Sequence, residues 1–74
     1  MSEDNLIRMA NQIGTFFESM PDRQEALAGA AGHIKKFWDP RMRKAFLARL
    51  DADNGSEVSD FVRETVRLHR QMFE

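Results

Sequence analysis

A chain of 74 residues without a cysteine forms one small domain, in which no disulfide or thiolate is available for stability or chemistry. Its 11 basic and 12 acidic residues leave a formal net charge of −1, which excludes binding of polyanions by bulk attraction. No apolar run approaches the roughly 20 residues that span a bilayer, and the acidic start Met1-Ser2-Glu3-Asp4 is unlike a signal peptide. These features predict a soluble, cytoplasmic protein.

The first predicted helix covers about residues 3–20. Apolar residues recur along it at spacings of three and four and form one stripe, at Leu6, Met9, Ile13, Phe16, Phe17 and Met20. A second face of this helix carries Arg8, Asn11, Gln12 and Thr15. Amides and a hydroxyl contribute less to solubility than Lys or Glu does. This face is therefore either an ordinary solvated surface or a hydrogen-bonding contact with a partner.

A second helix is predicted over about residues 22–37, beginning with a capping-box pattern of Asp22 and Glu25. Its apolar side consists of Leu27, Ala30, Ala31, Ile34, Phe37 and Trp38. Gly29 and Gly32 inside the helix each cost about 0.8–1 kcal/mol relative to alanine. We expect a neighbouring helix to approach the small residues closely. That neighbour is either another helix of this chain or part of a partner.

Asp39 and Pro40 separate the second helix from a third one over about residues 40–50. Proline disfavours the helical conformation of the residue before it, and Asp is a good N-cap. Pro40 can then occupy the first helical position, where its missing N–H costs nothing. The basic and aromatic residues of the chain are densest around this junction: His33, Lys35, Lys36, Phe37, Trp38, Arg41 and Arg43.

The cations after Pro40 are unusual for the start of a helix. Helix N-termini favour acids, so Arg41 and Arg43 each oppose the helix dipole by up to about 0.3–1 kcal/mol. Lys35 and Lys36, in contrast, lie in the last turn of the preceding helix, where the dipole favours cations. Trp and Arg are enriched in binding hot spots. The sequence therefore predicts that Arg41 and Arg43 face a partner, whereas Trp38 is either a core residue or part of the same surface.

An acidic loop over residues 51–55 is predicted to end at Gly55, with Ser56 as the N-cap of a fourth helix over about 56–73. No sustained alternation of apolar and polar residues indicates a strand. We therefore predict an all-α fold, a small bundle of three to four helices, in a single domain spanning residues 1–74.

The sequence contains no constellation that indicates an active site, a cofactor site or a metal site. His33 and His69 are each isolated among helical residues. The acidic loop fails as a calcium-binding EF-hand loop because Val62 stands where the last glutamate ligand is required. Gly29 and Gly32 lie inside a helix, without the preceding strand of a phosphate-binding loop. We predict neither catalysis nor a bound cofactor.

Two blocks of the sequence are long and compositionally unusual: Leu6-Ile7-Arg8-Met9-Ala10-Asn11-Gln12-Ile13-Gly14-x-Phe16-Phe17 and His33-Ile34-x-x-Phe37-Trp38-x-Pro40-Arg41-Met42-Arg43. Both resemble the delta subunit of soluble, NAD-dependent, molybdenum-containing formate dehydrogenase, over about residues 3–50. The resemblance implies a non-catalytic small subunit that binds no metal itself. Its partner would be the catalytic (alpha) subunit, which carries the molybdenum cofactor and iron–sulfur clusters. The small subunit would support assembly, stability or molybdenum-cofactor insertion.

The resemblance also implies which residues bind the partner. The matching polar residues are Arg8, Asn11, Gln12, His33, Arg41 and Arg43, with Phe37 and Trp38 as apolar anchors. Their division between internal packing and the partner surface is left open. The alternative hypothesis is a small helical nucleic-acid-binding domain that uses the basic residues between Lys35 and Arg49. The even overall charge argues against it, so we expect no nucleic-acid partner. Self-association through exposed apolar residues is also left open.

Overall fold

A computed structural model describes residues 3–53 and 55–74 and places four α-helices and one short 3₁₀ helix in them. The elements are α1 (Glu3–Glu18), α2 (Arg23–Phe37), α3 (Pro40–Ala52), α4 (Asp60–His69) and η1 (Arg70–Met72). These described residues contain no strand, so the predicted all-α bundle is confirmed. Met1 and Ser2 of the predicted acidic start, and position 54 of the predicted acidic loop, lie outside them.

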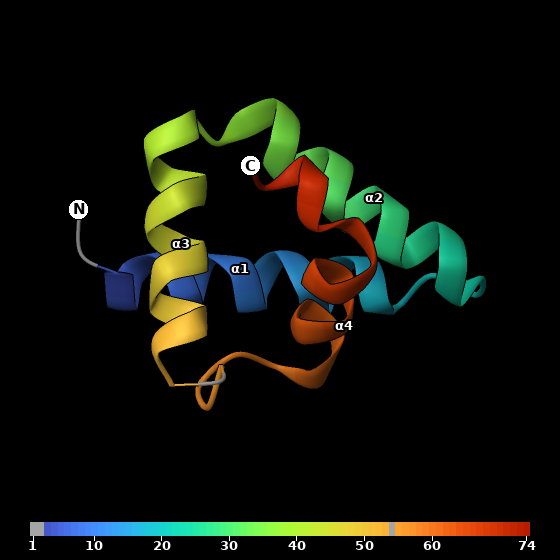
Figure 1. Ribbon diagram of the computed structural model, residues 1–74. Coiled ribbons are helices and arrows are strands. Elements are labelled where there is room, and N and C mark those ends of the chain that lie inside the picture. Colours follow the sequence, from blue (N-terminus) through green and yellow to red (C-terminus); the bar gives the residue numbers. More distant parts are fainter. Residues whose placement is uncertain (1–2, 54) are drawn as a thin grey trace.

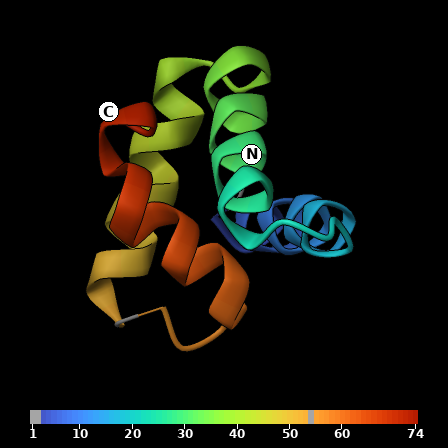
Figure 2. The same ribbon diagram turned by 90° about the vertical axis from the view of Figure 1, so that its right-hand side faces the viewer.

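Helix α1 runs along the back of the molecule in Figure 1, and the other helices pack on it. The upright α3 crosses the N-terminal half of α1. The N-terminal end of α2 lies near the C-terminal end of α1, and α2 rises from there. Helix α4 packs against both α1 and α2, and η1 returns the C-terminus to the space between α2 and α3. Figure 2 looks nearly along α1 and shows it beside the lower end of α2.

Two of the predicted helix starts are confirmed in their atomic detail. The Asp22 carboxylate accepts a hydrogen bond from the Glu25 N–H at 3.1 Å, as an N-cap does. The Asp39 carboxylate accepts one from the Met42 N–H at 2.9 Å, with Pro40 in the first turn. The junction between α2 and α3 is therefore set by local sequence.

The predicted start of the last helix is wrong. Helix α4 begins at Asp60, and its N-cap is Ser59, whose hydroxyl accepts a hydrogen bond from the Val62 N–H at 3.2 Å. The Ser56 hydroxyl instead donates a hydrogen bond to the Asp53 carboxylate. The backbone before Ser59 is engaged elsewhere: the Val58 N–H donates to the Gly55 carbonyl in a turn, and Asn11 bonds the Glu57 carbonyl and the Ser59 N–H.

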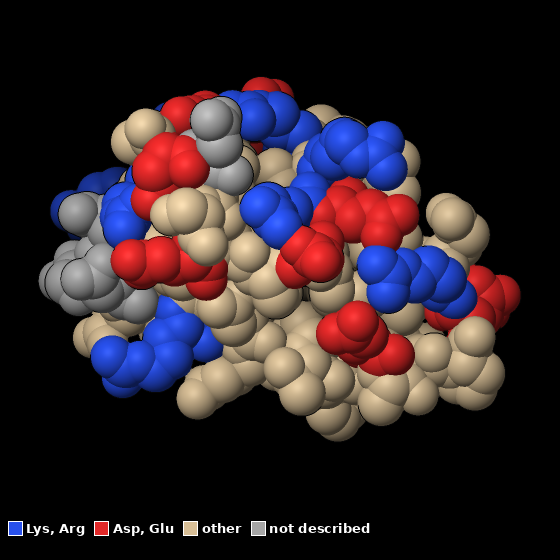
Figure 3. Space-filling view, turned by 90° about the horizontal axis from the view of Figure 1, so that it is seen from below, with Lys and Arg blue, Asp and Glu red and all other residues tan. Residues whose placement is uncertain are grey.

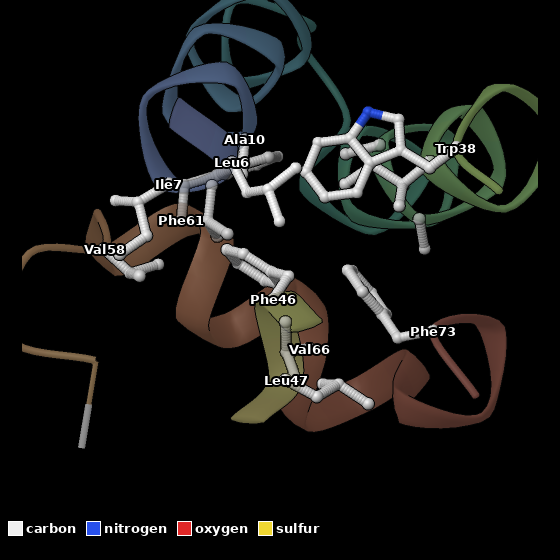
Figure 4. Packing of buried hydrophobic residues seen from close by; sticks show 14 of the residues in the cluster. Leu6, Ile7, Ala10, Trp38, Phe46, Leu47, Val58, Phe61, Val66 and Phe73 are labelled. Atoms are coloured by element: carbon white, nitrogen blue, oxygen red, sulfur yellow. The ribbon is translucent and has the colours of Figure 1, made fainter. Parts of the chain in front are cut away.

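The core is centred on the ring of Phe46 in α3 (Figure 4). Trp38 meets it edge-on, with ring centroids 5.8 Å apart, and Phe73 stacks on it at 5.9 Å. All three side chains are buried. Aromatic pairs of this kind contribute about 0.5–1.5 kcal/mol beyond the area they bury. The three rings join the end of α2, the middle of α3 and the C-terminal end of the chain into one core.

The helical glycines have different surroundings. A Cβ atom on Gly14 would lie 2.7 Å from Val62 Cγ2, so α1 and α4 approach each other closely at that point. A Cβ on Gly29 would lie 2.9 Å from the ring of Phe17, so the neighbour of Gly29 is internal to the chain. Beyond its chain neighbours and the backbone of its own helix, nothing lies within 4 Å of a Cβ placed on Gly32.

We therefore expect opposite effects from two glycine-to-alanine substitutions. Gly32→Ala should raise the free energy of unfolding by about 0.5–1 kcal/mol, because alanine has the higher helix propensity and its methyl group meets open space. Gly14→Ala should lower it by about 1–3 kcal/mol, because the methyl group would force α1 and α4 apart. Thermal unfolding followed by circular dichroism measures both. Equal shifts of Tm would contradict this difference in packing.

Candidate functional site

An apolar groove of about 580 Å³ opens between α1 and α2 and ends at the first turn of α3. Volumes of about 300–1,000 Å³ are typical of ligand-binding clefts. Apart from one amide and one imidazole its lining is apolar, and it consists of Met9, Gln12, Ile13, Phe16, Phe17, His33, Phe37, Trp38 and Met42. We call this feature the apolar groove.

A continuous row of four rings crosses the groove from α1 to α2. Phe16 packs on Phe17 at 5.2 Å, Phe17 on His33 at 5.9 Å, and His33 on Phe37 at 4.7 Å between ring centroids. The two ends of the row face solvent, since Phe16 is 71% exposed and Phe37 is 65% exposed. Exposed apolar patches of this kind on a small protein mark interaction sites. The groove is therefore the candidate functional site of the chain.

The end of the groove nearest α3 is positively charged. The Lys36 ammonium lies 5.6 Å from the centroid of the Phe37 ring, within cation–π range. Arg41 is exposed and lines a second hollow that shares Met42 with the groove. The acid of that hollow, Asp39, is engaged as the N-cap of α3. Among the described residues, no acidic side chain lines the groove itself.

The prediction that Arg43 faces a partner is corrected by the structure. Its side chain is only 7% exposed, and Nη1 donates to the carbonyl oxygens of Lys35 and Trp38, both at 2.9 Å. Carbonyl groups at the end of a helix lack partners within the helix, so the guanidinium satisfies two of them for α2. Trp38 is likewise a core residue, 4% exposed, although it also borders the floor of the groove. Both side chains hold the junction together.

The polar face predicted on α1 is divided between the interior and the surface. The Asn11 amide donates to the Glu57 carbonyl at 3.0 Å, and its oxygen accepts from the Ser59 N–H at 2.9 Å. Asn11 thus ties α1 to the start of α4. Gln12 is exposed and lines the groove, whereas Arg8 is exposed on α1 outside the groove lining.

The predicted partner-binding residues are therefore only partly brought together. The groove unites Gln12, His33, Phe37 and Trp38, with Arg41 beside it. The sequence interpretation missed Phe16, which is the most exposed aromatic side chain described. The adjacency of Phe16 and Phe17 gave no signal for this exposure, because neighbouring residues of a helix can both be buried, as Leu6 and Ile7 of α1 are.

Removing the Asn11 side chain should weaken the fold measurably. Asn11→Ala loses two hydrogen bonds and leaves a backbone carbonyl and a backbone N–H without partners, which costs about 1–2 kcal/mol. Gln12→Ala is the matched control, because Gln12 is the next residue and is exposed. Urea denaturation should show a lower midpoint for the first variant alone. A similar shift in both would contradict the internal role of Asn11.

Many of the remaining charged side chains form ion pairs with one another. Arg70 hydrogen-bonds Asp51 at 2.8 Å and holds the pKa of that carboxyl below its usual value, and Arg49 lowers the pKa of Asp53 in the same way. In Figure 3, basic and acidic side chains intermingle over the upper part of the surface, and the lower part is largely uncharged. Among the basic residues between Lys35 and Arg49, Arg43 is buried and Arg49 forms an ion pair with Asp53. These two cations are therefore already engaged within the chain, which argues against the nucleic-acid hypothesis.

Neither a metal cluster nor a membrane span occurs among residues 3–53 and 55–74. They contain no group of three or more His, Cys, Asp or Glu residues arranged to hold a metal ion. None of their helices is long and apolar enough to cross a membrane.

The fold and the groove together define a class of protein: a small all-α bundle that presents an aromatic groove at its surface. Within that class, the chain belongs to the family described as NADH-dependant formate dehydrogenase delta subunit FdsD, whose family model matches residues 5–66. The match includes every residue that lines the groove, and it confirms the family predicted from the two sequence blocks. No curated protein and no solved structure matches the chain.

Proposed function

We propose that this chain is a non-catalytic subunit of a cytoplasmic formate dehydrogenase complex, and that it binds the catalytic subunit. In doing so it supports the assembly, the stability or the molybdenum-cofactor insertion of that subunit. Membership of the delta-subunit family supports a place in such a complex. The observation that carries the binding role is the exposure of Phe16 and Phe37 at the two edges of the apolar groove.

The energetics of this surface favour a bound partner. Burying a large apolar side chain that was exposed contributes about 1.5–3 kcal/mol. A domain of this size has a folding stability of only a few kcal/mol. The free energy available from burying its exposed aromatic rings is therefore comparable to its whole stability. A partner that covers Phe16 and Phe37 would stabilise both itself and this chain.

The positions of His33 and Arg43 support a binding role rather than a catalytic one. The ring of His33 is packed between Phe17 and Phe37, in the floor of the groove. The buried cation, Arg43, is engaged by the backbone carbonyls of Lys35 in α2 and of Trp38, the C-cap of α2. We therefore assign both residues to the construction of the surface.

Co-purification tests this proposal. The affinity-tagged chain is co-expressed with the catalytic subunit, and we expect the two to be recovered together. When the chain is deleted, we expect less soluble catalytic subunit, or less molybdenum per subunit by elemental mass spectrometry. Failure to co-purify, with unchanged yield and molybdenum content after deletion, would contradict the proposal.

A further inference from the structure

We infer that the apolar groove receives one amphipathic α-helix of the catalytic subunit, and that this helix places an acidic residue beside Lys36 and Arg41. The inference rests on the proposed function and adds to it the docking site and the kind of element that occupies the site.

The shape of the groove favours a helix as its occupant. Its walls are two helices, α1 and α2, and its far end is the first turn of a third, α3. An amphipathic helix can lay its apolar face into such a groove through residues spaced three and four apart. The alternative of adding a strand has no template here, since the described part of the chain contains no sheet edge.

The chemistry of the lining specifies an apolar face on that helix. Phe16 and Phe37 project at the edges, and Phe17 and His33 form the floor between them. Met9 and Met42 are unbranched and can adapt their shape to side chains that enter the groove. The volume of about 580 Å³ accommodates several side chains at once. Gln12 is the amide at the edge of α1 and can satisfy a polar group of the incoming helix.

The charges at the α3 end indicate where an acidic residue of that helix lies. Arginines elsewhere, such as Arg23 with Glu64 and Arg70 with Asp51, have acidic partners within the chain. Lys36 and Arg41 have no such ion pair among the described residues. Arg41 also stands in the first turn of α3, where the helix dipole disfavours a cation. An acidic side chain of the partner at this end would compensate the positive charges of both Lys36 and Arg41.

Site-specific crosslinking in the intact complex tests the inference. A photoreactive benzoylphenylalanine replaces Phe16 in the full chain, which is co-expressed with the catalytic subunit. The matched control replaces Leu68, an exposed apolar residue of α4 outside the groove. We expect the probe at position 16 to crosslink at least about tenfold more strongly than the probe at position 68. The crosslinked peptide should carry apolar residues at helical spacing and an acidic residue. A carbodiimide should join Lys36 to a carboxylate of the same peptide.

The outcomes separate the inference from the proposed function. Crosslinks from position 16 to a non-helical segment, to a second copy of this chain, or no stronger than from position 68 would overturn the groove as the docking site. If the complex is recovered but position 16 gives no crosslink, the inference is wrong and the proposed function stands. If the unmodified chain does not co-purify with the catalytic subunit, both are wrong.

Discussion

Arg43→Ala is expected to lower the free energy of unfolding by about 2–4 kcal/mol. The substitution removes both hydrogen bonds from Nη1 to the carbonyl oxygens of Lys35 and Trp38, and it leaves the Trp38 carbonyl buried without a partner. It also removes a long side chain from a site that is only 7% exposed. Because a domain of this size is stable by only a few kcal/mol, a large unfolded fraction should appear at 37 °C.

Arg41→Ala is the matched control for this prediction. Arg41 carries the same side chain two residues earlier in the same helix, but it is exposed. Its removal should change the free energy of unfolding by less than about 0.5 kcal/mol. Urea titrations followed by the fluorescence of Trp38 measure both variants. Equal destabilisation of the two would show that Arg43 does not stabilise the junction in the way its contacts indicate.

The double substitution Phe16→Ser, Phe37→Ser is expected to weaken binding to the catalytic subunit roughly a hundredfold. Aromatic hot-spot residues each contribute about 1–2 kcal/mol or more to an interface, and each 1.4 kcal/mol is tenfold in affinity. The two side chains are 71% and 65% exposed, so the free domain should keep its fold. The loss of binding would then come from the surface alone.

Leu68→Ser provides the comparison for the double variant. Leu68 is an exposed apolar residue on α4, away from the groove lining. We expect this variant to bind the catalytic subunit as the unmodified chain does. Affinities from surface plasmon resonance, together with melting temperatures of all three proteins, measure the effect. Binding that falls equally in both variants, or that survives in the double variant, would be inconsistent with docking in the groove.

The helices and their local caps could be predicted because the signals lie close together in the sequence. The apolar spacing of α1 and the caps at Asp22 and Asp39 depend on residues at most a few positions apart. The start of α4 could not be predicted in this way. Both Ser56 and Ser59 are good N-caps, and the backbone before α4 is bonded to Asn11, which is distant in sequence.

The site was predicted only in part because its residues depend on contacts distant in sequence. Phe37 was predicted as an apolar anchor for a partner, and it is exposed at the edge of the groove. The Arg43 side chain, in contrast, bonds the carbonyl oxygens of Lys35 and Trp38 at the junction of α2 and α3. Asn11 is held by Glu57 and Ser59, which are 46 and 48 residues away. No local pattern distinguishes such a residue from one that faces a partner.

An electron cryo-microscopy map of the formate dehydrogenase complex that contains this chain is the most direct test of docking in the apolar groove. We predict a helix of the catalytic subunit lying between α1 and α2, with Phe16 and Phe37 buried beneath it and an acidic side chain next to Arg41. A map in which the groove is open to solvent, while α3 or α4 contacts the catalytic subunit, would contradict the account.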